Sequence, residues 1–134
     1  MDLIQYITSL DTIGQIVSGH TISARTLYKI ANVKIEIITA GEFPGDGLPK
    51  PVCFPDPEGQ TVEEDDVLAI NLEKLIELKL ASGLSATHRM RDLADVQDLI
   101  MALNLPLELK DELDISVRPE YQRIWEAANK DPQR

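Results

Sequence analysis

The sequence predicts an α+β protein, with a small mixed or antiparallel β-sheet, an N-terminal helix and a C-terminal set of three to four helices. Two observations lead to this class. Strand-like alternation lies within residues 22–70, whereas apolar residues recur at steps of three and four over residues 71–130. A chain of 134 residues with ordinary apolar content fits a single domain, expected over residues 1–130, with residues 131–134 as a frayed tail.

The β-rich half is expected to open with an amphipathic helix that ends near Gly19. Residues 22–30 then alternate loosely, and residues 33–39 form an apolar strand, so the intervening Ala31-Asn32 predicts a β-hairpin. A second short hairpin is expected from residues 61–62 and 67–70, with the acidic run 63–66 at its tip. The helix is predicted from apolar residues at helical spacing, which are Leu3, Ile4, Ile7, Leu10, Ile13, Ile16 and Val17.

Between the two hairpins lies a long segment that is rich in glycine and proline. Residues 41–60 contain four of the seven glycines and five of the eight prolines, a density that excludes a regular helix or strand. A loop of this length inside a compact domain is usually functional or well packed.

The helical half begins at Asn71, a good N-cap, and its first helix is expected to end at Ser82-Gly83. Thr87 is expected to cap the next helix, Pro106 to start a short helix that runs through residue 113, and Ser116 to cap the last helix. The expected buried positions are Leu93, Val96, Ile100 and Leu103 in the second helix and Val117, Tyr121, Ile124 and Trp125 in the last.

Composition and charge exclude several classes of function. A net charge of −10 argues against direct nucleic-acid binding, which relies on basic side chains that contact phosphates. A single cysteine, Cys53, excludes an internal disulfide and a Cys-rich zinc site, and its apolar and proline neighbours favour a packing role. Without a signal peptide or an apolar run of about eighteen residues, a cytoplasmic protein with no membrane association is expected.

A few charged residues stand in unusual positions. Glu36 lies in the middle of an apolar strand, so it either faces solvent or holds something positive such as a metal ion. Lys79 lies on the apolar face of its helix, where it either covers apolar surface with its stem or serves a site. His88 and Asp92 could share a metal across one helical turn, but acids near a helix start are favoured by the helix dipole and are normally solvated.

Four segments, in this order, resemble the C-terminal part of small bacterial proteins of the nucleotidyltransferase fold. These proteins are related to the minimal nucleotidyltransferases and, broadly, to DNA polymerase beta. The segments are the strand 33–39, the loop 41–52 with its Gly-Glu-Phe-Pro-Gly-Asp-Gly start, the helical segment 75–83 and the segment 91–96. The resemblance covers roughly residues 30–128.

The resemblance implies a specific site. Such enzymes place two acids, as Asp-x-Asp, after a Gly-Gly or Gly-Ser turn and a third acid on a neighbouring strand. Together these acids hold Mg²⁺, which aligns a nucleoside triphosphate for attack at its α-phosphate. Glu36 matches the third acid, and so implies a catalytic metal ligand. Lys79 and Arg91 match basic substrate-binding positions, and Asp92 could orient the lysine toward phosphate.

The sequence departs from this family because no Gly-Gly or Gly-Ser turn with Asp-x-Asp precedes residue 33. We therefore expect a truncated or degenerate nucleotidyltransferase-like protein that is inactive on its own, with Glu36 as a vestigial third acid. One alternative is an active Mg²⁺-dependent transferase that another chain completes. Another is an antitoxin-like or regulatory interaction module that meets a basic protein. A sheet edge left by a missing N-terminal half would also favour a homodimer.

Overall fold

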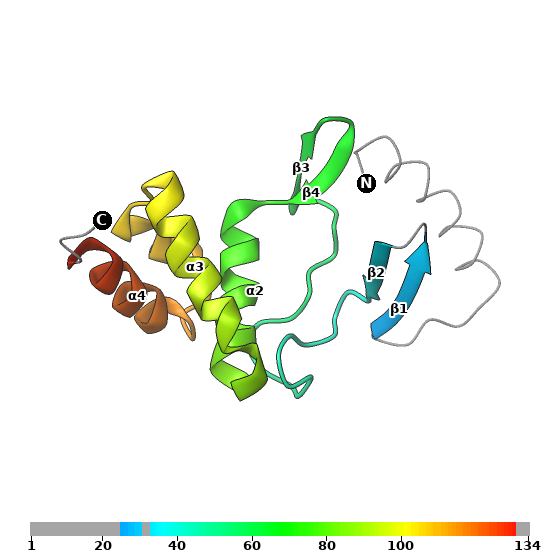
Figure 1. Cartoon of the computed structure of the whole chain (residues 1–134), viewed down its shortest axis with the longest axis horizontal. Coiled ribbons are helices and arrows are strands. Elements are labelled where there is room, and N and C mark those ends of the chain that lie inside the picture. Colours follow the sequence, from blue (N-terminus) through cyan, green and yellow to red (C-terminus); the bar gives the residue numbers. More distant parts are fainter. Residues whose placement is uncertain (1–24, 31–32, 131–134) are drawn as a thin grey trace.

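The computed structural model describes residues 25–30 and 33–130 and shows an α+β fold with its helices in the C-terminal part (Figure 1). Strands β1 (Arg25–Ile30) and β2 (Val33–Ile38) pair antiparallel, as do β3 (Thr61–Glu64) and β4 (Val67–Ile70). The predicted class and both hairpins are confirmed, although the described strands form two separate two-stranded sheets. The predicted N-terminal helix, the turn at residues 31–32 and the frayed tail lie outside the described residues.

The tip of the second hairpin is formed by Asp65 and Asp66, whereas Glu63 and Glu64, also expected at the tip, extend β3 and pair with β4. Asp65 and Asp66 have φ angles of 50° and 64°, the left-handed conformation that a two-residue type I′ turn requires at both positions. Aspartate tolerates this conformation better than most residues because its short side chain can hydrogen-bond locally. The turn fixes the β3–β4 register, in which Glu64 pairs with Val67.

The helical half consists of α2 (Leu72–Ser85), the 3₁₀ turn η1 (Thr87–Arg89), α3 (Met90–Leu103), the 3₁₀ helix η2 (Leu107–Glu112) and α4 (Arg118–Lys130). Helix α3 lies between α2 and α4 and contacts both (Figure 1). The fully buried large side chains of the described core come from these helices and the turn before α4, and they are Ile76, Leu80, Val96, Ile100, Val117 and Tyr121.

Helix α2 begins where the sequence predicts but continues past its expected end. The side chain of Asn71 accepts a hydrogen bond from the Lys74 N–H at 2.8 Å, which confirms the N-cap. Gly83 lies inside the helix, where it allows α2 to pack closely against α3. A Cβ atom at this position would lie 2.5 Å from Cγ of Leu93, so only glycine lets the two helices approach this closely.

Two details of α3 differ from the expected pattern. Thr87 lies inside η1 and makes no side-chain cap, so α3 itself begins three residues later, at Met90. Leu103, expected in the buried stripe, is 54% exposed, because α3 ends there and the chain turns through Asn104 with a φ of 49°. Leu105, just beyond the turn, packs against the core instead.

Helix α4 is fixed to the segment before η2 by its aromatic residues. The Tyr121 hydroxyl donates to the Pro106 carbonyl at 2.8 Å, and the Trp125 indole N–H donates to the Leu105 carbonyl at 2.9 Å. Burial raises the pKa of Tyr121 to about 12. The predicted inner face of this helix is therefore confirmed at both aromatic positions.

Asp114, rather than the predicted Ser116, organises the turn before α4. Both the hydroxyl and the backbone N–H of Ser116 donate to Oδ1 of Asp114, at 2.6 and 2.9 Å. The backbone N–H of Asp114 in turn donates to the buried carboxylate of Glu77 at 2.6 Å. These hydrogen bonds join the start of α4 to α2.

We expect Asp114→Asn to lower the free energy of unfolding by roughly 0.5–1 kcal/mol at pH 7. The hydrogen bonds from the Ser116 hydroxyl and N–H hold the pKa of Asp114 below its ordinary value. A lowered pKa stabilises the fold above the ordinary pKa, near 4, and this contribution disappears as the pH falls through the lowered value. Urea denaturation between pH 7 and pH 2 should therefore show the difference between wild type and variant shrinking below about pH 4. A difference that stays constant over this range would contradict this role of the carboxylate.

Candidate functional site

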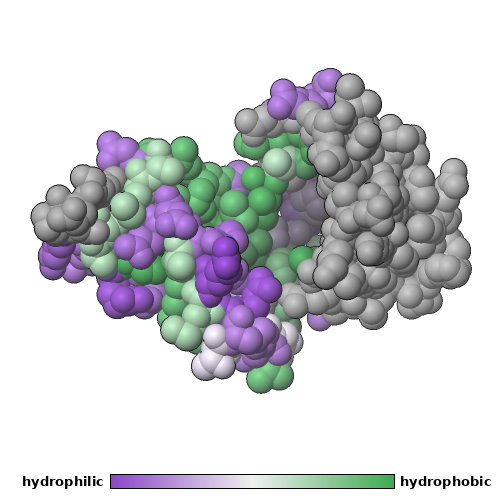
Figure 2. Space-filling view, in the orientation of Figure 1, coloured by the Kyte–Doolittle hydropathy of each residue, from purple (hydrophilic) through white to green (hydrophobic). Residues whose placement is uncertain are grey.

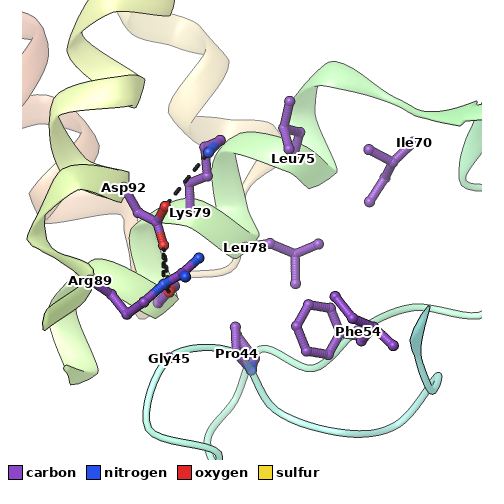
Figure 3. A pocket seen from close by; sticks show the side chains of 11 residues that line it. Pro44, Gly45, Phe54, Ile70, Leu75, Leu78, Lys79, Arg89 and Asp92 are labelled. Carbon is purple, nitrogen blue, oxygen red and sulfur yellow. Dashed lines mark hydrogen bonds and ion pairs between the residues drawn. The ribbon is translucent and has the colours of Figure 1, made fainter. Parts of the chain in front are cut away.

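A cavity of about 300 Å³ lies between the loop 41–54 and the helices α2 and α3 (Figure 3). Its wall on one side is polar or charged, formed by Lys79, Ser82, Arg89 and Asp92. The rest of the lining is mainly apolar and comes from Ile38, Pro44, Phe54, Ile70, Leu75 and Leu78. An apolar pocket of this size with a few convergent polar groups is the common form of a small-molecule site.

The loop 41–54 is closed on itself at its base. The N–H of Gly41 donates to the carbonyl of Phe54, and the N–H of Phe54 donates to the carbonyl of Glu42, both at 2.8 Å. Val52 is buried and Phe54 is half-buried, so Cys53 between them points outward and is exposed. The packing role predicted for Cys53 is therefore wrong, whereas the loop as a whole is well packed.

Gly45 brings the loop against the last turn of α2. Its φ of +73° is in the left-handed region, and a Cβ atom there would lie 2.7 Å from the Ser82 carbonyl oxygen and 2.0 Å from the Ser85 hydroxyl. The next N–H, of Asp46, donates to that same Ser85 hydroxyl at 3.2 Å. The absence of a side chain at residue 45 is thus what allows the loop to border the cavity.

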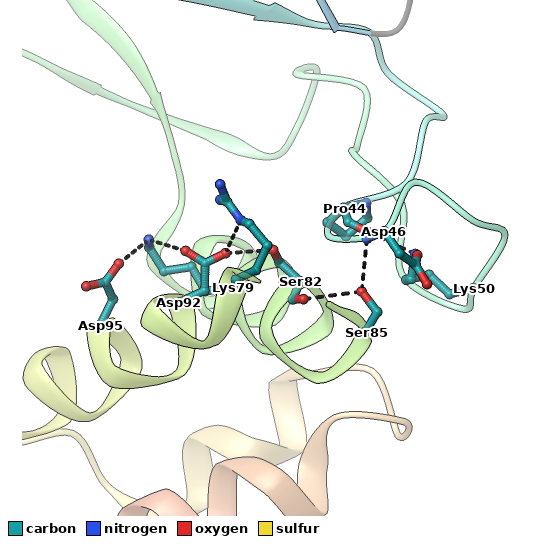
Figure 4. A network of polar contacts seen from close by, with 9 residues as sticks. Pro44, Asp46, Lys50, Lys79, Ser82, Ser85, Asp92 and Asp95 are labelled. Atoms are coloured by element: carbon teal, nitrogen blue, oxygen red, sulfur yellow. Dashed lines mark hydrogen bonds and ion pairs between the residues drawn. The ribbon is translucent and has the colours of Figure 1, made fainter. Parts of the chain in front are cut away.

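Lys50 holds the loop in shape from within (Figure 4). Its ammonium donates to the carbonyl oxygens of Pro44 and Leu48, at 2.8 and 2.6 Å, and to the carboxylate of Asp46 at 2.6 Å. The hydrogen bond from Lys50, followed by that from the Leu48 N–H, lowers the pKa of Asp46. The three hydrogen bonds of the Lys50 ammonium are thus all made to atoms of the loop.

The charged wall of the cavity is centred on Asp92, which is only 7% exposed (Figure 4). One carboxylate oxygen accepts hydrogen bonds from the Ser82 hydroxyl at 2.6 Å and from Nε of Arg89 at 3.0 Å. The other lies 3.6 Å from the ammonium of Lys79, which also donates to Asp95 at 2.9 Å. A buried carboxylate needs such partners, and here α2, η1 and α3 each supply one or more of the groups in this network.

Arg89 is the cation of this wall whose terminal N–H groups have no hydrogen-bond partner among the described residues. Only its Nε donates to partners in the described part of the chain, namely Asp92 and Ser82, and its side chain is 42% exposed. The two terminal nitrogens, with four N–H groups, are therefore available on a residue that lines the cavity. A guanidinium group with free terminal nitrogens can donate two parallel hydrogen bonds to the oxygens of one carboxylate or phosphate group.

The structure brings together some of the residues that the sequence singled out. Lys79 and Asp92 form an ion pair at the cavity wall, so the ammonium of Lys79 belongs to the charged cluster. Arg91 is exposed and does not line the cavity. Glu36 lies in β2 opposite Leu27, two residues before Ile38, which does line the cavity. His88 is exposed.

Ser82, Arg89 and Phe54 are among the cavity residues that the sequence analysis did not predict as site residues. Spacing contains a signal for two of them. Arg89 precedes Asp92 by three residues and Ser82 follows Lys79 by three, and residues at this spacing share a helix face. Phe54 has no such signal, because its position depends on how the loop folds back on α2.

Among the residues whose side chains the structure describes, no group of three or more His, Cys, Asp or Glu is arranged to hold a metal ion. His88 is exposed, and Asp92 is already engaged by two cations, Lys79 and Arg89. Glu36 alone would supply one carboxylate to an ion that prefers six oxygen ligands.

Two broader findings concern the class of protein. Within the part of the chain that the structure describes, no helix is long and apolar enough to cross a membrane. Comparisons with protein-family models, with curated proteins and with solved structures find no match to this chain.

Proposed function

We propose that this chain is a nucleotidyltransferase-like protein that binds a nucleoside triphosphate in the cavity beside loop 41–54 and does not transfer a nucleotide on its own. The observation that carries the proposal is the available guanidinium end of Arg89 beside an apolar floor. Phosphate oxygens would accept hydrogen bonds from Arg89, while the base would lie against the apolar side chains of Phe54 and Leu78.

The charges of the wall limit the expected affinity. Lys79 and Arg89 contribute two positive charges, and Asp92 and Asp95 contribute two negative charges, so this cluster is neutral overall. A neutral wall attracts a polyanion only through the directed donors of Arg89. We therefore expect a dissociation constant of about 0.1–1 mM, which corresponds to roughly 4–5.5 kcal/mol of binding free energy.

Transfer chemistry is not expected from the isolated chain. In the 134 residues no Gly-Gly or Gly-Ser turn with Asp-x-Asp precedes the strand of Glu36, and the transfer needs several acids to position metal and triphosphate. The alternative proposal is a Mg²⁺-dependent transferase in which another chain supplies those acids. Glu36→Ala separates the two, because it should abolish transfer only in the completed enzyme.

Arg89→Gln should weaken ATP binding about tenfold, because it removes the two terminal guanidinium nitrogens and keeps a polar side chain that ends at the position of Nε. The measurement is isothermal titration calorimetry of the full chain with ATP and with CTP, each with and without Mg²⁺, at up to about 5 mM ligand, given the expected affinity range. Arg91→Gln is the matched control, since Arg91 is exposed, lies two residues further along the chain in α3 and does not line the cavity. It should leave affinity within about twofold of wild type.

Three results would contradict the proposal. Absence of binding heat for both nucleotides would exclude the nucleotide site. A larger loss with Arg91→Gln than with Arg89→Gln would return the substrate-binding role to Arg91, as the family resemblance implies. Incorporation of labelled nucleotide by the isolated chain with Mg²⁺, abolished by Glu36→Ala, would show that the chain is an active transferase.

A further inference from the structure

A second cavity, which we call the hairpin groove, lies between the β3–β4 hairpin and the proline-rich end of the long loop. It has a volume of about 310 Å³ and is mainly apolar, with Phe54, Pro55, Pro57, Leu68, Ile70 and Leu78 in its lining. Leu68 is 69% exposed, and the apolar surface beneath the hydrophilic hairpin tip is visible in Figure 2. An exposed apolar groove with a polar rim is typical of an interaction site.

The strand register shows which residues of the hairpin face this groove. Thr61 pairs with Ile70, and Glu63 pairs with Leu68, so all four side chains project from the same face of the two strands. Thr61, Leu68 and Ile70 line the groove. Glu63 is exposed and therefore stands at the outer end of the groove face. Val62 projects from the opposite face and does not line the groove.

Exposed acidic residues lie close in sequence to the groove-lining residues of both the hairpin and the loop. Residues 51–73 contain seven Asp or Glu and no Lys, Arg or His. On the hairpin side Glu63, Asp65 and Asp66 are exposed, and on the loop side Asp56 and Glu58 are exposed next to the groove-lining Pro55 and Pro57. We call these exposed acids the rim of the hairpin groove. An apolar groove with an acidic rim favours a ligand that is apolar at its centre and positively charged around it.

We propose that the hairpin groove binds a segment of a partner protein in which an apolar anchor residue is flanked by lysines or arginines. The anchor would cover Leu68 and Phe54, and the flanking cations would meet the carboxylates of the rim. A second copy of this chain is disfavoured as occupant, because each copy carries a net charge of −10.

This inference goes beyond the nucleotide site and can fail separately from it. The two cavities share Phe54, Ile70, Leu78 and Ile38, so they adjoin each other. Leu68, however, lines only the hairpin groove, and Arg89 lines only the first cavity. Variants at these two positions therefore report on one site each.

The test is fluorescence anisotropy of the full chain with a labelled, amidated peptide, Lys-Lys-Phe-Leu-Lys-Lys. Binding should occur with a dissociation constant of about 10–100 µM and weaken as salt is raised. The peptides Glu-Glu-Phe-Leu-Glu-Glu and Lys-Lys-Ser-Ser-Lys-Lys should each bind at least about fivefold more weakly, since each lacks one half of the complementarity. Leu68→Ser should weaken binding of the first peptide about fivefold, while Val62→Ser, on the other face of the hairpin, should not.

Four outcomes would overturn the proposal. They are no peptide binding by folded wild type, equal losses in Leu68→Ser and Val62→Ser, equal binding of the three peptides, and a dimer seen by light scattering that Leu68→Ser dissociates. The last outcome would assign the groove to a second copy. ATP calorimetry on Leu68→Ser separates the two sites, because unchanged nucleotide binding together with lost peptide binding is the expected pattern.

Discussion

Gly45→Ala should lower the free energy of unfolding by about 3 kcal/mol or more and release loop 41–54 from α2. A non-glycine residue in the left-handed region costs about 1–2 kcal/mol. At residue 45 the new methyl group would also lie 2.7 Å from the Ser82 carbonyl oxygen, an atom fixed by the backbone of α2. The Ser85 hydroxyl, at 2.0 Å, could rotate away, but only by giving up its hydrogen bond from Asp46. Because the Ser82 carbonyl cannot move without distorting α2, the loop is expected to separate from the helix.

Gly47→Ala is the matched control, because Gly47 has a φ of +76° in the same loop and a Cβ atom there would meet nothing within 4 Å. It carries the backbone strain without the overlap, so it should cost about 1–2 kcal/mol. Urea denaturation gives the stability difference, and amide hydrogen exchange of Phe54, whose N–H closes the loop, reports its release. Equal losses in both variants would show that backbone strain alone lowers the stability.

Gly45→Ala should also abolish ATP binding, because Pro44 and Gly45 line the cavity.

Much of the fold could be predicted because local patterns determine it. Helical spacing and the Asn71 cap located α2, alternation located the strands, and the acidic run contained the two residues of the hairpin tip. Gly83 shows where such reasoning stops. A glycine after an apolar run predicts a helix end, yet its function here is close packing against Leu93, a contact between residues ten positions apart.

The candidate site was predictable only in part, for the same reason. Lys79 and Asp92 were singled out and do meet, but Arg89 received no separate role although it carries the available donors. Whether a charged residue at a helix start is solvated or buried depends on what α2 places opposite it. Ser82 and Lys79 lie opposite Asp92, and this arrangement is set by the packing of the two helices.

Asp92→Ala should lower the free energy of unfolding by about 2–4 kcal/mol, the largest effect expected among the acids of α3. Its removal leaves the Ser82 hydroxyl and Nε of Arg89 without their carboxylate acceptor, and Lys79 with Asp95 as its remaining counter-charge. The cost stays below that of a fully buried ion pair, because Lys79 and Arg89 are both partly exposed and can regain water.

The regular spacing of Asp92, Asp95 and Asp98 supplies the control series. By sequence the three acids are equivalent, whereas the structure makes the first buried, the second half-buried and the third exposed. Asp95→Ala should therefore cost about 0.5–1 kcal/mol and Asp98→Ala less than about 0.5 kcal/mol. Urea denaturation of the three variants at neutral pH tests this order. Equal and small losses would mean that all three acids are solvated, as acids near a helix start normally are, and that Asp92 does not hold the charged wall of the cavity together.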